Sequence, residues 1–554
     1  MTARCIMVLG TTSGAGKSWL TTALCRYYQR QGLKVAPFKA QNMSNNARVV
    51  ASESGQGGGF PAGPPQGKTL PPRGAGSHTP WATVGAEIGS AQYFQALAAR
   101  AVPDVRMNPL LLKPEHDTHS QVVLMGQVNE GLSRMDWRGR SNHVWPVIAQ
   151  ALDDLRAEND VVVIEGAGSP AEINLSSSDI VNMRVALHAQ AACLLVTDID
   201  RGGAFAHLYG TWALLPVNER ALIKGFVLNK FRGDAGLLAP APQMLQDLTG
   251  IPTVATLPMW WQHGLPEEDG VFDDRSIASG AVTQTVAVIA YPRISNLDEY
   301  QPLKNVPGVR LQWVRSPSEI SALRQTDWII LPGSKNTSGD LAWLRSQGLD
   351  AAVARHAGQG GAVLGICGGL QMLGEALIDP HGVDGNAPGL GLLPLVTVFE
   401  ADKTVRHTQT RFAAQMTAQG IAAATTSGDV DAPSAATGQG APRAAHDPWS
   451  ALAGVQVSGY EIHHGQTQPH AAMKAAGDVA MEVLAGGLGW QNPAGNVLGL
   501  YLHGLFEDPA ALQALFGGRF NKLVPTLDSV FDGLADFIEQ HFEPGALQAL
   551  LKPN

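Results

Sequence analysis

A short apolar run near the N-terminus leads directly into a glycine-rich loop, and a helical pattern follows. Residues 5–9 (Cys-Ile-Met-Val-Leu) are apolar, as expected for a buried parallel strand. Residues 10–18 (Gly-Thr-Thr-Ser-Gly-Ala-Gly-Lys-Ser) come next, and the helical pattern extends to about Gln31. A strand, a loop of this kind and a helix in that order are typical of a phosphate-binding loop at the edge of a parallel sheet.

The chemistry of this loop predicts a nucleotide site. Backbone amides around Gly14 and Gly16 would hold phosphate oxygens, Lys17 would reach the terminal phosphates, and Ser18 would ligate Mg²⁺. The spacing departs from the usual motif, since five residues rather than four separate Gly10 from Gly16. A glycine-rich turn with an accidental lysine is the alternative, but the strand and helix on either side favour ATP.

A second strand-to-helix turn carries a cysteine. The apolar run 363–366 ends at Cys367, and Gly368 and Gly369 lead into a helical pattern. This is the layout of a nucleophile elbow, a sharp turn that presents the reactive atom at the top of a sheet. Only small neighbours permit such a turn, which accounts for the glycines, including Gly365. A lone cysteine here would more often be structural, but its glycine frame favours a nucleophile.

Downstream, His503 is the candidate base for Cys367. It lies within the apolar run 500–506, where a histidine is often only a satisfied core residue, but the cysteine elbow favours catalysis. The backbone amides of Gly368, Gly333 and Ser334 are candidates for an oxyanion hole.

Composition excludes several classes of protein. The chain has 554 residues and should hold at least two domains. A net charge of −9 without Lys/Arg runs argues against nucleic-acid binding, and no apolar run is long enough to span a membrane. The cysteines lie far apart, so we expect neither zinc nor a disulfide framework. No secretory signal is visible, and we expect a cytoplasmic enzyme, with homo-oligomerisation left open.

The pattern of strands and helices predicts two α/β units. In the first, apolar strands at 35–38, 161–164, 193–196 and 225–228 alternate with helical patterns, which implies a mostly parallel sheet covered on both faces. A second unit begins near Val286. The expected segments are a first domain 1–262 with a disordered Gly/Pro-rich insert 53–80, a linker 263–284, a second domain 285–508 with a low-complexity insert 417–447, and a helical tail 509–554.

With both sites placed, the chain resembles the glutamine-hydrolysing cobyric acid synthases of cobalamin biosynthesis. The first half is also similar to dethiobiotin synthetase, and the second half to class I glutamine amidotransferases. The resemblance covers nearly the whole chain outside the two inserts. The runs that carry it are 38–43 (FKAQNM), 108–114 (NPLLLKP), 165–170 (EGAGSP), 198–203 (DIDRGG), 229–233 (NKFRG), 331–337 (LPGSKNT) and 459–463 (GYEIH).

The resemblance implies a reaction. Cobyric acid synthases amidate four peripheral carboxylates (b, d, e, g) of adenosylcobyrinic acid a,c-diamide, consuming ATP and glutamine each time. A carboxylate is a poor electrophile and must be activated, and ammonia released inside the protein stays neutral and local. The expected ligands are therefore ATP, Mg²⁺, glutamine as ammonia donor and a corrinoid substrate. The alternatives are cobyrinic acid a,c-diamide synthase, with the same plan but other carboxylates, and a regulatory ATPase of the deviant phosphate-loop type.

The resemblance also assigns residues around the nucleotide. Lys39 ends the second strand and resembles a phosphate-contacting lysine, and Glu165 ends another and would be a magnesium ligand. Asn229 resembles the adenine-reading asparagine of dethiobiotin synthetase, with a turn cap as the alternative. The residues expected to contact the corrinoid or a metal, unless they form a solvated loop, are Asn42, Asp198, Asp200 and Arg201.

The second half departs from the amidotransferase pattern at one point. Class I amidotransferases usually carry a glutamate two residues after the histidine, and here that position is Leu505. We therefore expect a Cys–His dyad. His463 is left open between a structural and a glutamine-lining residue. Glu87 lies in a family-like run next to the first insert, and its function is also open.

Overall fold

The structure is a computed structural model of the 554-residue chain. It describes residues 2–51, 85–116, 119–175, 178–260, 263–266, 281–416, 447–517 and 527–552. The predicted insert 53–80, nearly all of the predicted insert 417–447 and most of the predicted linker 263–284 lie outside these ranges. Within the described residues, no helix combines the length and apolar character needed to cross a membrane.

The first half is built on a six-stranded sheet in which all neighbouring strands are parallel. The four strands predicted from apolar runs all belong to it, and their side chains are almost completely buried because helices cover both faces. In spatial order the strands are β12 (Thr253–Pro258), β11 (Ile223–Phe231), β10 (Ala192–Asp198), β1 (Arg4–Gly10), β9 (Val161–Glu165) and β2 (Val35–Phe38).

Several helices of the first half follow the carboxyl ends of these strands, and others follow the smaller strands that lie between β2 and β9 in the sequence. The phosphate loop joins β1 to the first of them, as the sequence predicted. The longer helices are α1 (Lys17–Arg30), α2 (Ser90–Ala98), α4 (Trp137–Glu158), α5 (Met183–Ala189), α6 (Ala204–Leu214) and α8 (Ala241–Thr249), and the short ones are α3 (Glu130–Arg134), α7 (Val217–Arg220), η1 (Val105–Met107) and η3 (Ala235–Leu238).

The second half contains a seven-stranded sheet. Its first five strands are parallel and its last two are antiparallel, giving the order β15 (Val309–Val314), β13 (Gln284–Ile289), β16 (Trp328–Leu331), β18 (Ala362–Ile366), β25 (Val497–Leu500), β24 (Gly489–Gln491) and β23 (Met481–Leu484). Its helices are α9 (Pro317–Ser321), α10 (Thr337–Ser346), α11 (Leu349–Gly358), α12 (Gly368–Leu373), α13 (Ala471–Ala475), η4 (Leu297–Asn305) and η6 (Ser450–Leu452).

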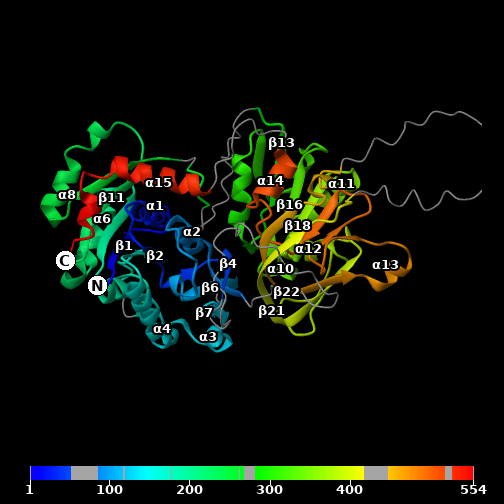
Figure 1. Ribbon diagram of the computed structural model, residues 1–554, viewed down its shortest axis with the longest axis horizontal. Coiled ribbons are helices and arrows are strands. Elements are labelled where there is room, and N and C mark those ends of the chain that lie inside the picture. The colour runs from blue at the N-terminus through cyan, green and yellow to red at the C-terminus, as the bar shows by residue number, and fades with distance from the viewer. Residues whose placement is uncertain are drawn as a thin grey trace, which may run out of the picture.

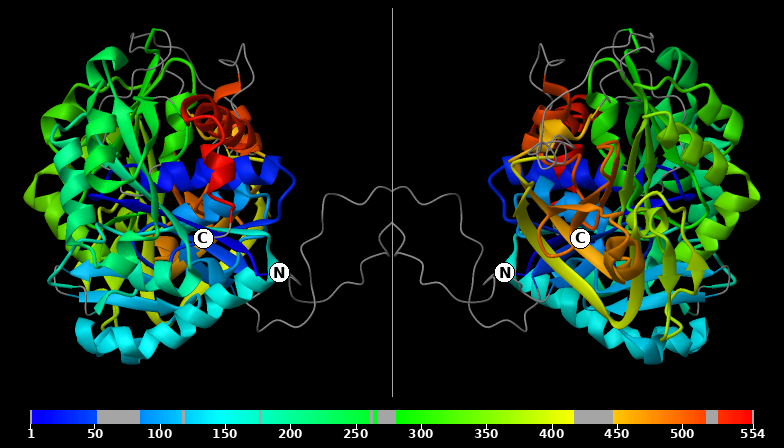
Figure 2. Two further views of the ribbon diagram at one scale, coloured as in Figure 1. Left: turned by 90° about the vertical axis from the view of Figure 1, so that its left-hand side faces the viewer. Right: turned by 90° about the vertical axis from the view of Figure 1, so that its right-hand side faces the viewer.

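Smaller sheets lie between and beside the two halves. Figure 1 shows β4, β6 and β7 between the two main sheets, facing the long β21–β22 hairpin, which is also visible in the right-hand view of Figure 2. The strands are β3 (Gln41–Met43), β4 (Ala47–Ala51), β5 (Gly85–Gly89), β6 (Leu110–His116), β7 (His119–Leu124), β8 (Gln127–Val128), β14 (Ile294–Ser295), β17 (Gly333–Ser334), β19 (Ala376–Ile378), β20 (Ala387–Pro388), β21 (Leu395–Arg411) and β22 (Gln456–Pro469).

The last helices return to the first half. After α14 (Pro509–Phe516) come α15 (Leu527–His541) and α16 (Ala546–Ala549), and α15 lies along α1, so both chain termini are in the first half (Figure 1). Phe531, Leu534 and Ile538 of α15 are buried in the same apolar core as residues of β1 and α1. Arg26 of α1 is fully buried and pairs with Asp528 of α15.

Candidate functional sites

The phosphate loop has the backbone that its glycines predicted. Gly14 and Gly16 have φ angles of 72° and 100°, a region that favours glycine. A Cβ on Gly16 would lie 2.1 Å from Asn229 Nδ2, so the loop packs tightly against the end of β11. Lys17 Nζ donates to the carbonyl oxygens of Thr12 (3.0 Å) and Gly168 (3.3 Å) and so lies across the loop.

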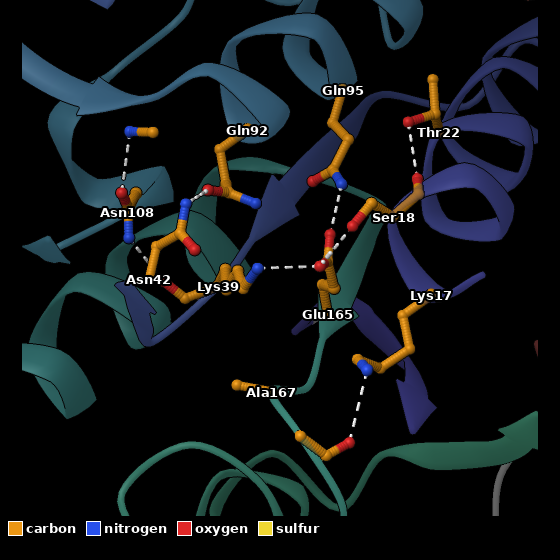
Figure 3. A network of polar contacts seen from close by, with 12 residues as sticks. Lys17, Ser18, Thr22, Lys39, Asn42, Gln92, Gln95, Asn108, Glu165 and Ala167 are labelled. Carbon is orange, nitrogen blue, oxygen red and sulfur yellow. Dashed lines mark hydrogen bonds and ion pairs between the residues drawn. The ribbon is translucent and has the colours of Figure 1, made fainter. Parts of the chain in front are cut away.

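Glu165 gathers three donors at the end of β9 (Figure 3). Its Oε1 accepts from Ser18 Oγ at 2.8 Å and from Lys39 Nζ at 2.9 Å, and its Oε2 accepts from Gln95 Nε2 at 2.6 Å. Burial by itself raises the pKa of Glu165, but the Lys39 charge and these hydrogen bonds outweigh it and lower that pKa. Three residues predicted separately, Ser18, Lys39 and Glu165, are thus neighbours, and Gln95 joins them.

The donor set around Glu165 suits magnesium. Mg²⁺ is usually held through one or two carboxylates, with phosphate oxygens and water completing its shell. A buried carboxylate beside the Ser18 hydroxyl at the mouth of a phosphate loop meets that requirement. Among the described residues, no cluster of three or more His, Cys, Asp or Glu forms a closed metal site.

Asn229 braces the phosphate loop. Its Nδ2 donates to Ala15 O at 2.9 Å, and its Oδ1 accepts from Lys230 N at 2.9 Å, so both ends of the amide are engaged with backbone. Beyond it, a cavity of about 570 Å³ opens at the ends of β11 and β12. It is lined by Phe231, Arg232, Gly233, Thr256, Pro258, Met259 and His541.

The predicted substrate residues lie in two places. Asp198 pairs with Lys230 (3.1 Å), whose Nζ also donates to Gly14 O at 2.8 Å, so this carboxylate is tied to the phosphate loop. Asp200 pairs with Arg232, and the Arg201 side chain is 72% exposed. Asn42 is instead buried, where its Nδ2 donates to Gln92 Oε1 at 3.1 Å (Figure 3).

Cys367 adopts the strained backbone of a nucleophile elbow. Its φ of 52° is left-handed, which is uncommon for a residue with a side chain. A Cβ on Gly369 would lie 1.9 Å from Leu331 O, and one on Gly368 would lie 2.8 Å from Ser334 N. The glycines therefore let the elbow approach the neighbouring strand end, and they bring the predicted oxyanion donors Gly368 and Ser334 side by side.

His503 is buried next to Cys367 and is held by a carboxylate that the sequence did not reveal. Its Nδ1 lies 3.1 Å from Glu299 Oε1, while Glu299 Oε2 accepts from Gly504 N at 3.1 Å. Burial by itself lowers the pKa of His503, but Glu299 and the hydrogen-bonded Cys367 raise it to about 10. Glu299 is thus a carboxylate that the expected Cys–His dyad did not include.

The spacing of residues in the sequence does not identify Glu299 as a partner of His503. It lies in η4, near the start of the second half and far from the histidine in sequence, whereas the position that the amidotransferase pattern indicates, Leu505, is a buried apolar residue. The only sequence signal is the acidic pair Asp298–Glu299 in an otherwise polar stretch. Gly333 also borders the site, since a Cβ on it would lie 3.1 Å from His503 Cε1.

The two residues whose functions were left open, His463 and Glu87, both contact other residues of the chain. His463 Nδ1 donates to Gly465 O (2.8 Å), and its ring stacks on Tyr501 with centroids 3.9 Å apart. Glu87 is fully buried and pairs with Lys113 of its own half and with Lys403 of the other half. Glu87 thus joins the two halves.

Comparisons with known proteins agree with this arrangement. Residues 6–263 match a family described as the CobQ/CobB/MinD/ParA nucleotide binding domain, and residues 285–511 match the CobB/CobQ-like glutamine amidotransferase domain. A cobyric acid synthase of Albidiferax ferrireducens is 74% identical over the full length of both chains, and one of Polaromonas naphthalenivorans is 71% identical over the full length of both. One of Leptothrix cholodnii is 58% identical, covering 100% of this chain and 98% of its own.

Proposed function

The chain belongs to the cobyric acid synthase family, and we propose that it uses ATP and glutamine to amidate the b, d, e and g carboxylates of adenosylcobyrinic acid a,c-diamide. The observation that carries this proposal is the presence, in one chain, of a phosphate loop beside Lys39 and Glu165 and of a buried Cys367–His503–Glu299 arrangement. The first suits activation of a carboxylate by ATP, and the second suits release of ammonia from glutamine.

In the first half, a substrate carboxylate oxygen would attack the terminal phosphorus of ATP. ADP leaves and an acyl phosphate forms, and attack by ammonia then gives the amide and releases phosphate. Lys17 and Lys39 would stabilise the charge on the transferring phosphoryl group. Ser18 and Glu165 would hold Mg²⁺, which supplies further neutralisation of phosphate charge when bound.

The rim of the phosphate loop would bind the remaining parts of the ligands. The cavity at the ends of β11 and β12 has room for the adenine ring. Asn229 would act by holding the loop rather than by reading the base, since both ends of its amide are engaged. Asp198, Asp200 and the exposed Arg201 would face the corrinoid, whereas Asn42, predicted to contact it as well, is buried against Gln92.

In the second half, the Cys367 thiolate would attack the side-chain amide carbon of glutamine. The backbone amides of Gly368 and Ser334, with Gly333 beside them, would stabilise the oxyanion. His503 would protonate the departing ammonia and would then take a proton from the water that hydrolyses the thioester, which releases glutamate. Glu299 would keep the imidazole oriented and favour its protonated form.

The test is an assay of the purified protein with ATP, glutamine and corrin acids, followed by mass spectrometry. Adenosylcobyrinic acid a,c-diamide should gain four equal mass steps, each replacing OH by NH₂. Conversion of the fully unamidated acid only as far as the diamide would favour the a,c-diamide synthase instead. ATP hydrolysis without glutamine hydrolysis would favour the regulatory ATPase.

Two variants separate the half-reactions. Cys367→Ala should abolish amidation from glutamine and preserve amidation from added ammonium, because only the ammonia source is lost. Lys17→Ala should lower both alike, because activation of the carboxylate is lost, by roughly 10²–10³-fold as for other electrostatic contacts to a transition state. A folded Cys367→Ala protein that is inactive with ammonium would contradict this division of labour.

A further inference from the structure

One strand of the first half reaches into the second half next to His503. Asn46 Oδ1, just before β4, accepts from Leu297 N at 2.9 Å, and Ala47 N donates to Asn296 Oδ1 at 2.9 Å. Asn296 Nδ2 in turn lies 3.3 Å from His503 Nδ1. The segment that carries Glu299 is therefore fastened to a strand of the other half at its first residues.

Arg48 of β4 makes the strongest of these contacts. Its guanidinium is almost completely buried and lies 2.5 Å from Asp298 Oδ2 and 2.5 Å from Glu507 Oε1. It also donates to the Tyr460 hydroxyl, and its Cζ is 5.1 Å from the centre of that ring. A planar guanidinium with several donors is suited to holding three acceptors in a fixed arrangement.

Each partner of Arg48 adjoins a group that fixes His503. Asp298 precedes Glu299, and Glu507 follows Gly504, whose amide binds Glu299. The Tyr460 ring stacks on the imidazole with centroids 5.2 Å apart and planes 16° apart, and the Tyr460 and His503 backbones are hydrogen-bonded to each other. Arg48 thus contacts Asp298, Glu507 and Tyr460, which hold the imidazole in place, without contacting the imidazole itself.

The charges explain why an arginine is needed here. Three carboxylates, Asp298, Glu299 and Glu507, surround His503, and Arg48 is the cation shared by two of them. Burial raises the pKa of Asp298 and of Glu507, and the Arg48 charge opposes that rise. With Arg48 in place, these two carboxylates are engaged, and Glu299 alone is left to bind the imidazole nitrogen.

We propose that Arg48 is a positioning residue for glutamine hydrolysis, supplied by the ATP-binding half to the amidotransferase site of the other half. This inference rests on the proposed function, in that Cys367 and His503 hydrolyse glutamine. Arg48 fixes Asp298, Glu507 and Tyr460, and these hold Glu299 and the imidazole in register with the thiol. The amidotransferase site is therefore complete only when the two halves are docked.

The test compares Arg48→Gln and Arg48→Lys in the full-length protein with Arg26→Gln. Arg26 is also a fully buried arginine of the first half, but its partners are on α15, far from His503 in the fold. Four quantities are measured: glutaminase kcat and KM, amidation from ammonium, the melting temperature, and the rate at which iodoacetamide alkylates Cys367.

The other three cysteines should react slowly with iodoacetamide. Burial raises the pKa of Cys5 to about 11 and that of Cys193 to about 12, and it raises the pKa of Cys25 further.

For Arg48→Gln we expect glutaminase kcat to fall about 10- to 100-fold, as for small misplacements of a catalytic group, with KM little changed. Alkylation of Cys367 at neutral pH should slow, because a displaced imidazole no longer stabilises the thiolate. Amidation from ammonium should stay within about twofold of wild type, since the phosphate site is not displaced. Arg48→Lys should be intermediate, because lysine keeps the charge but not the planar array of donors.

Two outcomes would overturn the proposal. Glutaminase kcat and alkylation near wild type in Arg48→Gln would show that the contacts do not position His503. Parallel loss of glutaminase, ammonium-dependent amidation and melting temperature, as expected of a general packing defect, would assign Arg48 to folding alone. If Arg48→Gln does not fold, Tyr460→Phe tests the same link, because it removes the hydroxyl that Arg48 binds and keeps the stacked ring.

None of these measurements of hydrolysis or alkylation uses the corrinoid. The test therefore remains valid if the proposed substrate is wrong. If the wild-type protein hydrolyses no glutamine, the proposed function itself is wrong.

Discussion

At the scale of single residues, the chemistry was predictable wherever a side chain follows a strand end. Ser18, Lys39 and Glu165 each follow a buried strand or its loop, and parallel strands bring their carboxyl ends to one edge, where these three side chains meet. The thiol of Cys367 was predictable from its glycines. The carboxylate that binds His503 was not, because Glu299 comes from a 3₁₀ helix that only the tertiary fold brings near.

The Glu299–His503 pair predicts a particular pH dependence. Glu299→Gln removes a charge that raises the pKa of His503, so this pKa should fall from its value of about 10 by roughly 1–3 units. Glutamine hydrolysis needs the protonated imidazole to deliver a proton to the departing ammonia, so the alkaline limit of glutaminase activity should move to lower pH by a similar amount. Glutaminase rates measured between neutral pH and pH 11 check this.

The same pair affects stability in a defined direction. Because the pKa of His503 is raised on folding, its contribution is fully present below the unfolded value of about 6.5 and is lost as pH rises through about 10. Glu299→Gln should therefore destabilise the protein most in acid solution. Glu400→Gln, which changes an exposed glutamate of β21, is the control. Equal pH profiles for the two variants would show that Glu299 does not govern the imidazole.

At the scale of elements, the strands and the helices that follow them were predictable. The half of the molecule on which the tail 509–554 packs was not. The apolar runs interpreted as strands at 5–9, 35–38, 161–164, 193–196, 225–228 and 363–366 all lie within strands of the two main sheets, and the second unit, expected to begin near Val286, begins with β13. The tail was expected only to be helical. Which core it completes depends on long-range packing, and local periodicity carries no information about that partner.

The packing of α15 on α1 gives a second prediction. Leu534→Ala removes a fully buried side chain from the core that α15 shares with β1 and α1, and it should cost about 2–5 kcal/mol of stability. We expect the unfolding transition of the first half, followed by calorimetry, to move to lower temperature. Gln540→Ala, at an exposed position of the same helix, should leave the temperature of this transition unchanged. An unchanged transition in Leu534→Ala would mean that α15 adds nothing to the stability of the first half.

At the scale of the whole molecule, family, fold class and type of reaction were all predicted from sequence, and the comparisons confirm them. The way in which the two halves join was not predicted, because neither insert nor linker patterns specify an interface. The structure shows that interface at Arg48 and, separately, at Glu87, which binds Lys113 of one half and Lys403 of the other.

The Glu87 contacts predict how docking depends on pH. Burial lowers the pKa of Lys113 to about 7 although Glu87 opposes this, and Glu87→Gln would leave both lysines without their carboxylate. Breaking such a buried pair typically costs about 3–5 kcal/mol. Without Glu87 the pKa of Lys113 should fall further below about 7, so the variant loses this proton at lower pH than the wild type does. The deficit of Glu87→Gln should therefore shrink as pH rises towards 7 and then level off.

Denaturant unfolding at several pH values checks this prediction. Glu130→Gln, which breaks the exposed Glu130–Arg134 pair, is the control and should change stability by less than about 1 kcal/mol at every pH. A Glu87→Gln deficit that is no larger than that of the control, or that grows with pH, would contradict the assignment of Glu87 to a buried ionic contact between the halves.

The return of α15 to the first half also fixes an order of events at the ribosome. The β-sheet that carries the phosphate loop is synthesised first, yet one of its two apolar faces is closed by residues near the very end of the chain. At about 5–20 residues per second, translation of the intervening second half delays that closure by tens of seconds. The amidotransferase half can bury its own core during this interval. A nascent or truncated chain would therefore contain a folded amidotransferase half before the ATP-binding half is finished, so an incomplete enzyme should not be able to consume ATP.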